Sequence, residues 1–188
     1  MINQLTLVEI RALDAGSWFS PRFAGTRIPT LEEFLKSFGK KTHLVLEIKD
    51  EKATRETLLI VKNLRLLNNV IFTSFNLKIV EEIKDFEPRA NIGFLTREVT
   101  REILKILKNL DIKQICPYAP LLSSSLVEKI RLFDISIRAW GVETEELMGK
   151  MLDLGVYSMT VNSPDKLIDL LKKRKIIENN LKNSVSNL

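Results

Sequence analysis

The chain has 188 residues, enough for one sizeable hydrophobic core and too few for two full domains. Hydrophobic residues make up 45% and charged residues 28% of the chain, and no apolar run is long enough to span a bilayer, so we expect a soluble globular protein. The net charge of +5 comes from 29 basic and 24 acidic residues that are interspersed, and only 7% of the residues are aromatic. This distribution argues against a nucleic-acid partner, which would call for a basic face interleaved with aromatic side chains.

The start of the chain, MINQLTLVEIRALD, lacks the basic segment and the apolar core of a signal peptide. Cys116 is the single cysteine, so no disulfide can form within the chain, and a reducing compartment is expected. The sequence therefore predicts a cytoplasmic protein. His43 is the single histidine, which excludes any mechanism that takes two imidazoles from this chain alone.

The first 28 residues are expected to form an irregular, aromatic-bearing loop. We expect Trp18 and Phe19 to anchor this loop on the rim of the fold. Pro29 and Thr30 then begin a helix over 29–38, which places its leucines and phenylalanines on one face.

From residue 43 onward, short runs rich in β-branched residues alternate with segments of helical period. We predict strands over 43–49, 69–75, 90–96, 113–118, 136–142 and 157–162. Helices are predicted over 53–67, 77–86, 98–110, 124–133, 144–155 and 163–174. Gly155 is expected to end its helix, and Asn162-Ser163-Pro164 to start the last one. One domain over 1–175 would then be followed by a polar tail, 176–188, that frays.

Such alternation indicates right-handed crossovers and a parallel sheet covered by helices, either a doubly wound open sheet or a (β/α)8 TIM-type barrel. The chain lacks the glycine-rich turn of a nucleotide-binding doubly wound sheet. Unusual residues instead follow several strands, as barrel active sites require: Glu47, Lys49, Ser74, Phe75, Phe94, Tyr118, Trp140, Thr160 and Asn162. We therefore predict a barrel. Eight units take about 250 residues, so six strands leave two β/α units missing.

The stretch LVLEIKD, residues 44–50, shows the pattern most clearly. Side chains alternate along a strand, so Leu44, Leu46 and Ile48 share one face, and Val45, Glu47 and Lys49 share the other. An acid and a base two residues apart at the end of an apolar run are unusual, and both would face the barrel interior. A structural ion pair is the alternative interpretation.

Several motifs together resemble the glycerophosphodiester phosphodiesterase family, in order and spacing, from about residue 5 to residue 174. The most specific is LTLVEIRALDAGSWFSPRFAGTRIPTLEEFL, followed by LVLEIK, FTSFN, IGFL, AWGVETEELMGKMLDLGV and TVNSPD. The resemblance implies a (β/α)8 barrel that hydrolyses glycerophosphodiesters to an alcohol and glycerol 3-phosphate with a divalent cation, Mg²⁺ or Ca²⁺. It implies that Glu47 binds the metal and that Lys49 contacts the phosphate. It also implies that Phe75, Phe94 and Trp140 wall the substrate cleft.

Three motifs of this family are absent from the 188 residues: a His-Arg-Gly motif on the first strand, a Glu-x-Asp pair on the second, and a following His-Asp motif. They would supply the two catalytic histidines and further metal carboxylates, so the chain is interpreted as an N-terminally truncated member. His43 cannot replace them, because it lies at the N-terminal end of its strand. Two hypotheses follow: a phosphodiesterase that obtains these groups elsewhere, or a non-catalytic relative that binds phosphate or serves as an interaction module. Six strands leave two open edges, which a homo-oligomer could cover.

Overall fold

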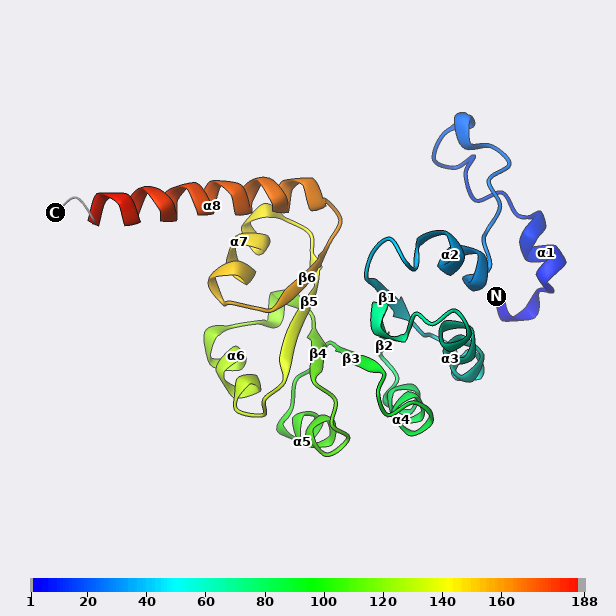
Figure 1. The fold of residues 1–188 in the computed structure, drawn as a ribbon, viewed down its shortest axis with the longest axis horizontal. Helices are drawn as coiled ribbons and strands as arrows, with labels where there is room; N and C mark the ends of the chain where they lie inside the picture. Colours follow the sequence, from blue (N-terminus) through cyan, green and yellow to red (C-terminus); the bar gives the residue numbers. More distant parts are fainter. Residues whose placement is uncertain (1, 186–188) are drawn as a thin grey trace.

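The computed structural model describes residues 2–185, of which Asn3 and residues 176–185 are described by their backbone only. Six parallel strands form one sheet in the order β1-β2-β3-β4-β5-β6, and the sheet curls into a half-barrel (Figure 1). The strands are β1 Leu44–Glu47, β2 Val70–Ser74, β3 Asn91–Thr96, β4 Gln114–Pro117, β5 Ser136–Val142 and β6 Ser158–Val161. All six lie within the predicted strand ranges, so the barrel-type prediction with six strands is confirmed.

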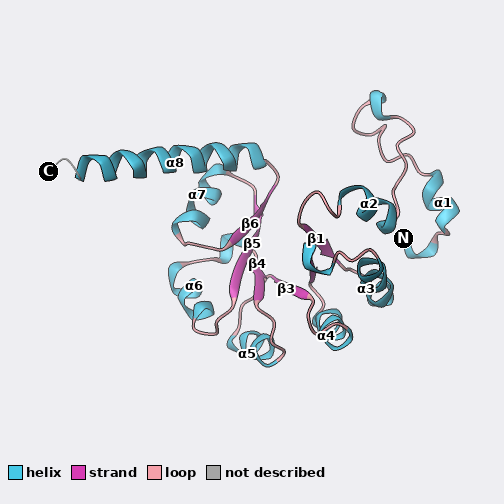
Figure 2. Ribbon diagram, viewed as in Figure 1, coloured by secondary structure: helices cyan, strands magenta, loops and turns pink. Residues whose placement is uncertain are grey.

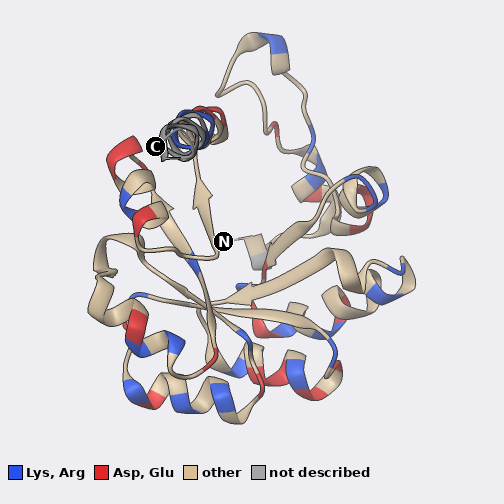
Figure 3. Cartoon of the chain, turned by 60° about the vertical axis from the view of Figure 1, so that its left-hand side comes forward, with Lys and Arg blue, Asp and Glu red and all other residues tan. Residues whose placement is uncertain are grey.

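Helices join consecutive strands and cover the outer face of the sheet (Figure 2). They are α3 Thr54–Asn63, α4 Leu77–Phe86, α5 Arg101–Asn109, α6 Ser124–Arg131 and α7 Glu145–Asp153; α1 Leu7–Ala12 and α2 Leu31–Phe38 precede β1, and α8 Pro164–Val185 follows β6. Basic and acidic residues alternate along the outer helices (Figure 3). Charge is therefore mixed over this helical layer.

The core lies between the outer face of the sheet and the inward faces of the helices. Phe72 of β2 and Ile115 of β4 are fully buried there, against helical residues such as Leu58, Ile83 and Leu107. Burying a side chain of this size stabilises the fold by about 1.5–3 kcal/mol. Because the sheet is covered on this face, its strands are apolar at alternate positions, which is the pattern that made them visible in the sequence.

The helix ends follow the predicted signals. Thr30 caps α2 with a capping box to Glu33, and α8 begins at Pro164 after Ser163. Gly155 ends α7 with a φ of +62°, the left-handed conformation that a glycine adopts without strain. Residues 176–185 of the predicted tail continue α8 as a helix to Val185, and residues 186–188 lie outside the described residues. The division at residue 175 stays a prediction.

The prediction of an irregular N-terminal segment was wrong at Leu7–Ala12, which forms α1. The signal for this helix is local: Thr6 accepts a hydrogen bond from the Glu9 N–H, and the Glu9 side chain accepts one from the Thr6 N–H. No residue of α1 is buried, so the apolar periodicity that revealed the other helices was missing here.

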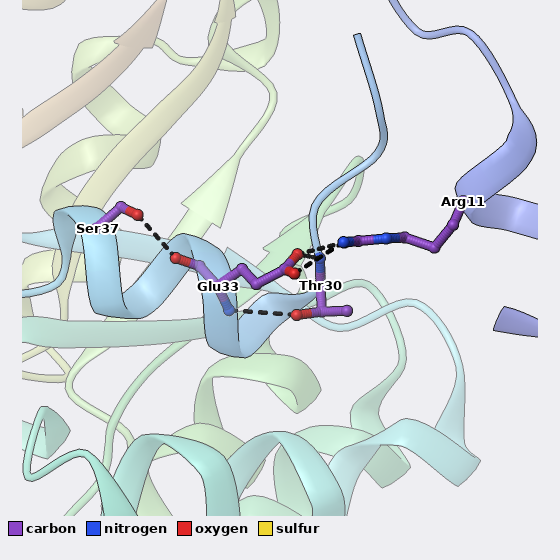
Figure 4. A network of polar contacts seen from close by, with 4 residues as sticks. All are labelled: Arg11, Thr30, Glu33 and Ser37. Atoms are coloured by element: carbon purple, nitrogen blue, oxygen red, sulfur yellow. Dashed lines mark hydrogen bonds and ion pairs between the residues drawn. The ribbon is translucent and has the colours of Figure 1, made fainter. Parts of the chain in front are cut away.

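An ion pair joins α1 to α2 (Figure 4). The Arg11 guanidinium donates to both carboxylate oxygens of Glu33, with Nη2 2.9 Å from Oε1. The same carboxylate accepts from the Thr30 N–H at 2.9 Å, and the Ser37 hydroxyl donates to the Glu33 carbonyl at 3.0 Å. Arg11 and Thr30 together lower the pKa of Glu33 to about 2.

The prediction that Trp18 and Phe19 anchor the loop on the barrel rim was wrong. Trp18 is 82% exposed and Phe19 is 69% exposed. Their rings pack edge to face, with centroids 5.8 Å apart. The residue that organises the loop is Asp14, whose carboxylate accepts hydrogen bonds from the Gly25 N–H, from the Ser17 hydroxyl and N–H, and from the Gly16 N–H. These bonds hold the pKa of Asp14 well below its ordinary range.

Two edges of the sheet stay open, since β1 and β6 each pair with one neighbour among the described strands. The helices beside these edges expose apolar side chains: Phe34 and Phe38 on α2, and Ile168 and Leu171 on α8. Over residues 2–185, each helix is too short or too polar to cross a membrane.

Candidate functional site

A cleft of about 720 Å³ opens inside the half-barrel, at the ends where the strands finish. Every strand except β4 contributes to its lining, which consists of Val45, Glu47, Lys49, Thr73, Phe75, Leu95, Arg97, Arg138, Trp140, Gly141, Met159, Thr160 and Val161. The carboxyl ends of barrel strands are where active sites of this architecture form. This cleft is therefore the candidate functional site.

The first strand presents its side chains to the cleft as the sequence alternation predicts. Val45, Glu47 and Lys49 line the cleft. The alternate residues of the stretch turn outward: Leu44 and Leu46 pack against the core, and Ile48 is buried in it. The strand is held in register by β2, with Glu47 opposite Thr73 and the Ile48 N–H donating to the Thr73 carbonyl at 2.8 Å.

Glu47 and Lys49, two residues apart at the end of β1, form an ion pair in the cleft lining, with Nζ and Oε2 3.7 Å apart. Three cationic side chains, Lys49, Arg97 and Arg138, line the cleft with this one carboxylate. The cleft thus carries an excess of positive charge, which favours an anion.

The cation implied by the resemblance does not fit this set of residues. Mg²⁺ and Ca²⁺ need several oxygen ligands and a negative environment, whereas Glu47 is already paired with Lys49. Among the described residues, no cluster of three or more His, Cys, Asp or Glu side chains could hold a metal. The metal-binding role of Glu47 and the phosphate-binding role of Lys49 stay predictions.

Aromatic side chains form one wall of the cleft. The Trp140 ring meets Phe75 edge-on, with centroids 5.3 Å apart, and lies 4.7 Å from the Tyr118 ring behind it. The two predicted cleft residues, Phe75 and Trp140, are therefore brought into contact with one another and into the cleft lining. The Trp140 indole N–H donates to the Thr96 carbonyl oxygen at 3.3 Å, which fixes the plane of the ring.

Gly141 leaves room for the Tyr118 ring within the aromatic wall. Its φ of +71° lies in the left-handed region, and an added Cβ would come within 2.5 Å of the Tyr118 ring. The pairing of β5 with β6 is irregular between Ala139 and Val142, around this glycine. The glycine therefore allows Tyr118 to pack close behind Trp140.

Phe94 does not line the cleft, contrary to the prediction. It is buried in the core, opposite Ser74 of β2 and Ile115 of β4, on the face of the sheet that the helices cover. Its neighbour Leu95 lines the cleft instead. Leu95 and Phe94 differ in this way because consecutive side chains of a strand point to opposite faces of the sheet.

The two arginines of the cleft were not singled out from the sequence. Arg138 lies two residues before Trp140, so strand alternation places both on one face and could have revealed it. Its Nε donates to Gln114 Oε1 at 3.2 Å. Arg97 follows the end of β3, where alternation is no longer a guide, and its guanidinium carbon lies over the rings of Tyr118 and Trp140.

His43 lies at the opposite end of the strands, as predicted. It lines a second cavity of about 680 Å³, together with Asn91 and Ser136 at the starts of β3 and β5. It therefore takes no part in the cleft. Thr160, in contrast, lines the cleft from β6.

Comparison with known proteins gives a consistent result. Residues 1–166 match the model of the glycerophosphoryl diester phosphodiesterase family. A glycerophosphodiester phosphodiesterase of Caldanaerobacter subterraneus subsp. tengcongensis is 31% identical over 182 residues, which cover 92% of this chain and 73% of that protein.

Solved structures agree in fold. A glycerophosphodiester phosphodiesterase from Parabacteroides distasonis superposes with a TM-score of 0.78 at 24% identity, covering 90% of this chain and 72% of that one. A phosphodiesterase from Oleispira antarctica, solved in complex with the product sn-glycerol-3-phosphate, superposes with a TM-score of 0.79 at 23% identity, covering 92% and 72%. The chain thus spans somewhat under three quarters of the length of these two structures.

Proposed function

Because this chain belongs to the glycerophosphoryl diester phosphodiesterase family, we propose that its cleft binds glycerophosphodiesters. The family activity to which this cleft would contribute is hydrolysis of the diester to an alcohol and glycerol 3-phosphate. The product complex of the Oleispira antarctica relative supports a glycerol phosphate ligand. The observation that carries the proposal is the cleft itself, where cationic side chains face an aromatic wall.

The proposed roles follow from the chemistry of the ligand. A phosphodiester carries one negative charge, which the Lys49 ammonium and the Arg138 guanidinium would contact. Glu47 would hold Lys49 in place through their ion pair. Phe75, which is exposed and meets Trp140 edge-on, would pack against an apolar face of the glycerol or of the alcohol.

We further propose that these 188 residues bind the diester without hydrolysing it. General acid–base catalysis needs two groups placed to give and take protons. In the described part of the cleft, Glu47 is the one carboxylate, and His43 lies at the far end of the strands. The non-catalytic alternative therefore has specific support, and hydrolysis would require groups from outside these residues.

Titration calorimetry with a soluble glycerophosphodiester tests the binding proposal. We expect saturable binding that Lys49→Gln weakens about tenfold, since it removes a charged hydrogen bond. Lys105→Gln, which removes a charge from the exposed face of α5, is the matched control and should bind like the parent protein. Equal affinities for all three proteins would contradict the proposed role of the cleft.

An activity assay separates binding from catalysis. Release of glycerol 3-phosphate from glycerophosphocholine and glycerophosphoglycerol would be followed with Mg²⁺ and then Ca²⁺, in parallel with Glu47→Ala. We expect no turnover above that of the variant. Metal-dependent turnover that Glu47→Ala abolishes would show that the chain is catalytic by itself and that another group replaces the histidines.

We also propose that a second copy of the chain covers the open edges of β1 and β6. The unpaired strand edges and the exposed apolar side chains of α2 and α8 support this assembly. Light scattering should give the mass of a dimer or larger assembly, and Phe34→Lys with Phe38→Lys should shift it toward the monomer.

A reducing compartment, and hence the cytoplasm, is supported by the free thiol of Cys116.

A further inference from the structure

The guanidinium of Arg97 lies over the aromatic wall of the cleft. Its Cζ is 4.8 Å from the centroid of the Trp140 ring and 5.1 Å from that of Tyr118. Both distances are within the roughly 6 Å over which the face of an aromatic ring attracts a cation. Arg97 is exposed and lines the cleft, so this contact forms at a surface that a ligand would reach.

This contact bears on which alcohol the cleft accepts. The face of a tryptophan in a cleft is the group that best binds a quaternary ammonium. Here the protein places its own cation over that ring. A ligand carrying a choline group would have to displace Arg97 from Trp140 or lie beside a like charge, and both disfavour its binding.

The other charged side chains of the cleft also disfavour a cationic alcohol. Lys49 and Arg138 add two positive charges, against the single carboxylate of Glu47. A guanidinium has five N–H groups, and those that the rings do not cover can donate to hydroxyl oxygens. An uncharged, hydroxyl-rich alcohol would therefore meet donors where a cationic one would meet repulsion.

We propose that Arg97 makes the cleft select glycerophosphodiesters whose alcohol is an uncharged polyol, such as glycerol or inositol, over those whose alcohol carries a quaternary ammonium. This selection rests on the proposed function, because it concerns the ligand of the same cleft. Arg97 acts here as a specificity-determining residue and takes no part in bond cleavage.

The test compares two ligands that differ in the alcohol: sn-glycero-3-phosphoglycerol and sn-glycero-3-phosphocholine. Each is titrated into the 188-residue protein, and the indole N–H signal of Trp140 is followed by NMR. The chain has two tryptophans, and Trp18 in the exposed loop serves as an internal reference. We expect the phosphoglycerol ligand to bind about fivefold more tightly.

Variants then assign the preference to Arg97. Arg97→Gln should bring the affinity ratio to about one, chiefly by improving phosphocholine binding, and Arg97→Lys should retain most of the preference. Arg101→Gln, which removes the same charge from the start of α5, should keep the ratio of the parent protein. The exposed position of residue 97 makes a folding defect in its variants easy to check by thermal denaturation.

The outcomes are distinguishable. If neither ligand shifts the Trp140 signal, the proposed function fails, and the inference fails with it. If both ligands bind with equal affinity, or if Arg97→Gln leaves the ratio unchanged, the proposed function stands and the role of Arg97 is overturned. A loss of both affinities by the same factor in Arg97→Gln would show that Arg97 binds the phosphate and does not select the alcohol.

Discussion

The indole Nε1–H of Trp140 donates a hydrogen bond to the carbonyl oxygen of Thr96, 3.3 Å away, and so ties β5 to the end of β3. Strand β4 lies between these two strands, and its neighbour Tyr118 forms a parallel bridge with Trp140. The Tyr118 N–H donates to the same Thr96 oxygen at 3.1 Å. One carbonyl therefore joins the ends of three strands below the aromatic wall.

Trp140→Phe should lower the free energy of unfolding by about 1 kcal/mol, because it removes this bond while the Thr96 oxygen keeps its partner on Tyr118. Urea denaturation measures the change. Trp18→Phe is the matched control: it also removes an indole hydrogen bond, to the Ala15 carbonyl oxygen, but on an exposed loop, and should change stability by less than about 0.5 kcal/mol. Equal effects of the two substitutions would contradict a structural role for the Trp140 bond.

Gly141→Ala should lower the free energy of unfolding by about 1–3 kcal/mol, since alanine disfavours the φ of +71° and its Cβ would clash with Tyr118. Thermal denaturation of the parent protein and the variant would measure this change in the free energy of unfolding. Gly149→Ala, in the middle of α7, meets only the end of Arg174 at 3.4 Å and should be neutral or gain about 0.5–1 kcal/mol. A neutral Gly141→Ala would show that Tyr118 can move away without cost.

The Cys116 thiol should resist alkylation in the native protein. It is fully buried in β4, and this burial raises the pKa of the thiol to about 12. At pH 8 roughly one thiol in ten thousand would be ionised, and reagents attack the thiolate. Mass spectrometry after iodoacetamide treatment should show labelling only in denaturant, whereas Ser124→Cys on the exposed start of α6 should label at once. Rapid native labelling of Cys116 would contradict its burial.

Because Arg11 and Glu33 form an ion pair, we expect the stability of the folded state to depend on pH in the acidic range. The pKa of Glu33 is lowered from its ordinary 4.5 to about 2, first by the Arg11 hydrogen bonds and then by the Thr30 N–H. A lowered carboxyl pKa stabilises the folded state fully above the unfolded value, and this contribution is lost as the pH falls from about 4.5 to about 2. The protection factors of the α1 amides against hydrogen exchange should therefore fall within that window.

NMR titration of the Glu33 carboxyl provides the direct measurement. Arg11→Gln should raise the pKa of Glu33 toward 4.5, because the largest lowering interaction is removed. Arg27→Gln removes an exposed arginine that has no role in this pair, and the pKa of Glu33 should stay near 2. A pKa near 4.5 in the parent protein would mean that the pair does not form in solution.

The sequence by itself determined the strands, most helices and one face of the cleft, because these follow from local patterns. A period of two placed Val45, Glu47 and Lys49 together, and helical periods with end signals placed α2 to α7 and the start of α8. Where the local signal had no apolar stripe, as in α1, the prediction failed. The prediction for Phe94, which came from the resemblance, was wrong because alternation along β3 places Phe94 on the core face and Leu95 on the cleft face.

Only the tertiary structure decided which side chains meet across strands. Arg97, Tyr118 and Trp140 come from β3, β4 and β5 or the turns that follow them, up to 43 residues apart in the chain, and their contacts depend on the hydrogen-bonded register of those strands. Alternation along one strand gives the face on which a residue lies, but it carries no information about the residue beside it on the next strand. The placement of a guanidinium over the cleft's tryptophan is therefore a property of the fold, set by register and by the left-handed turn at Gly141.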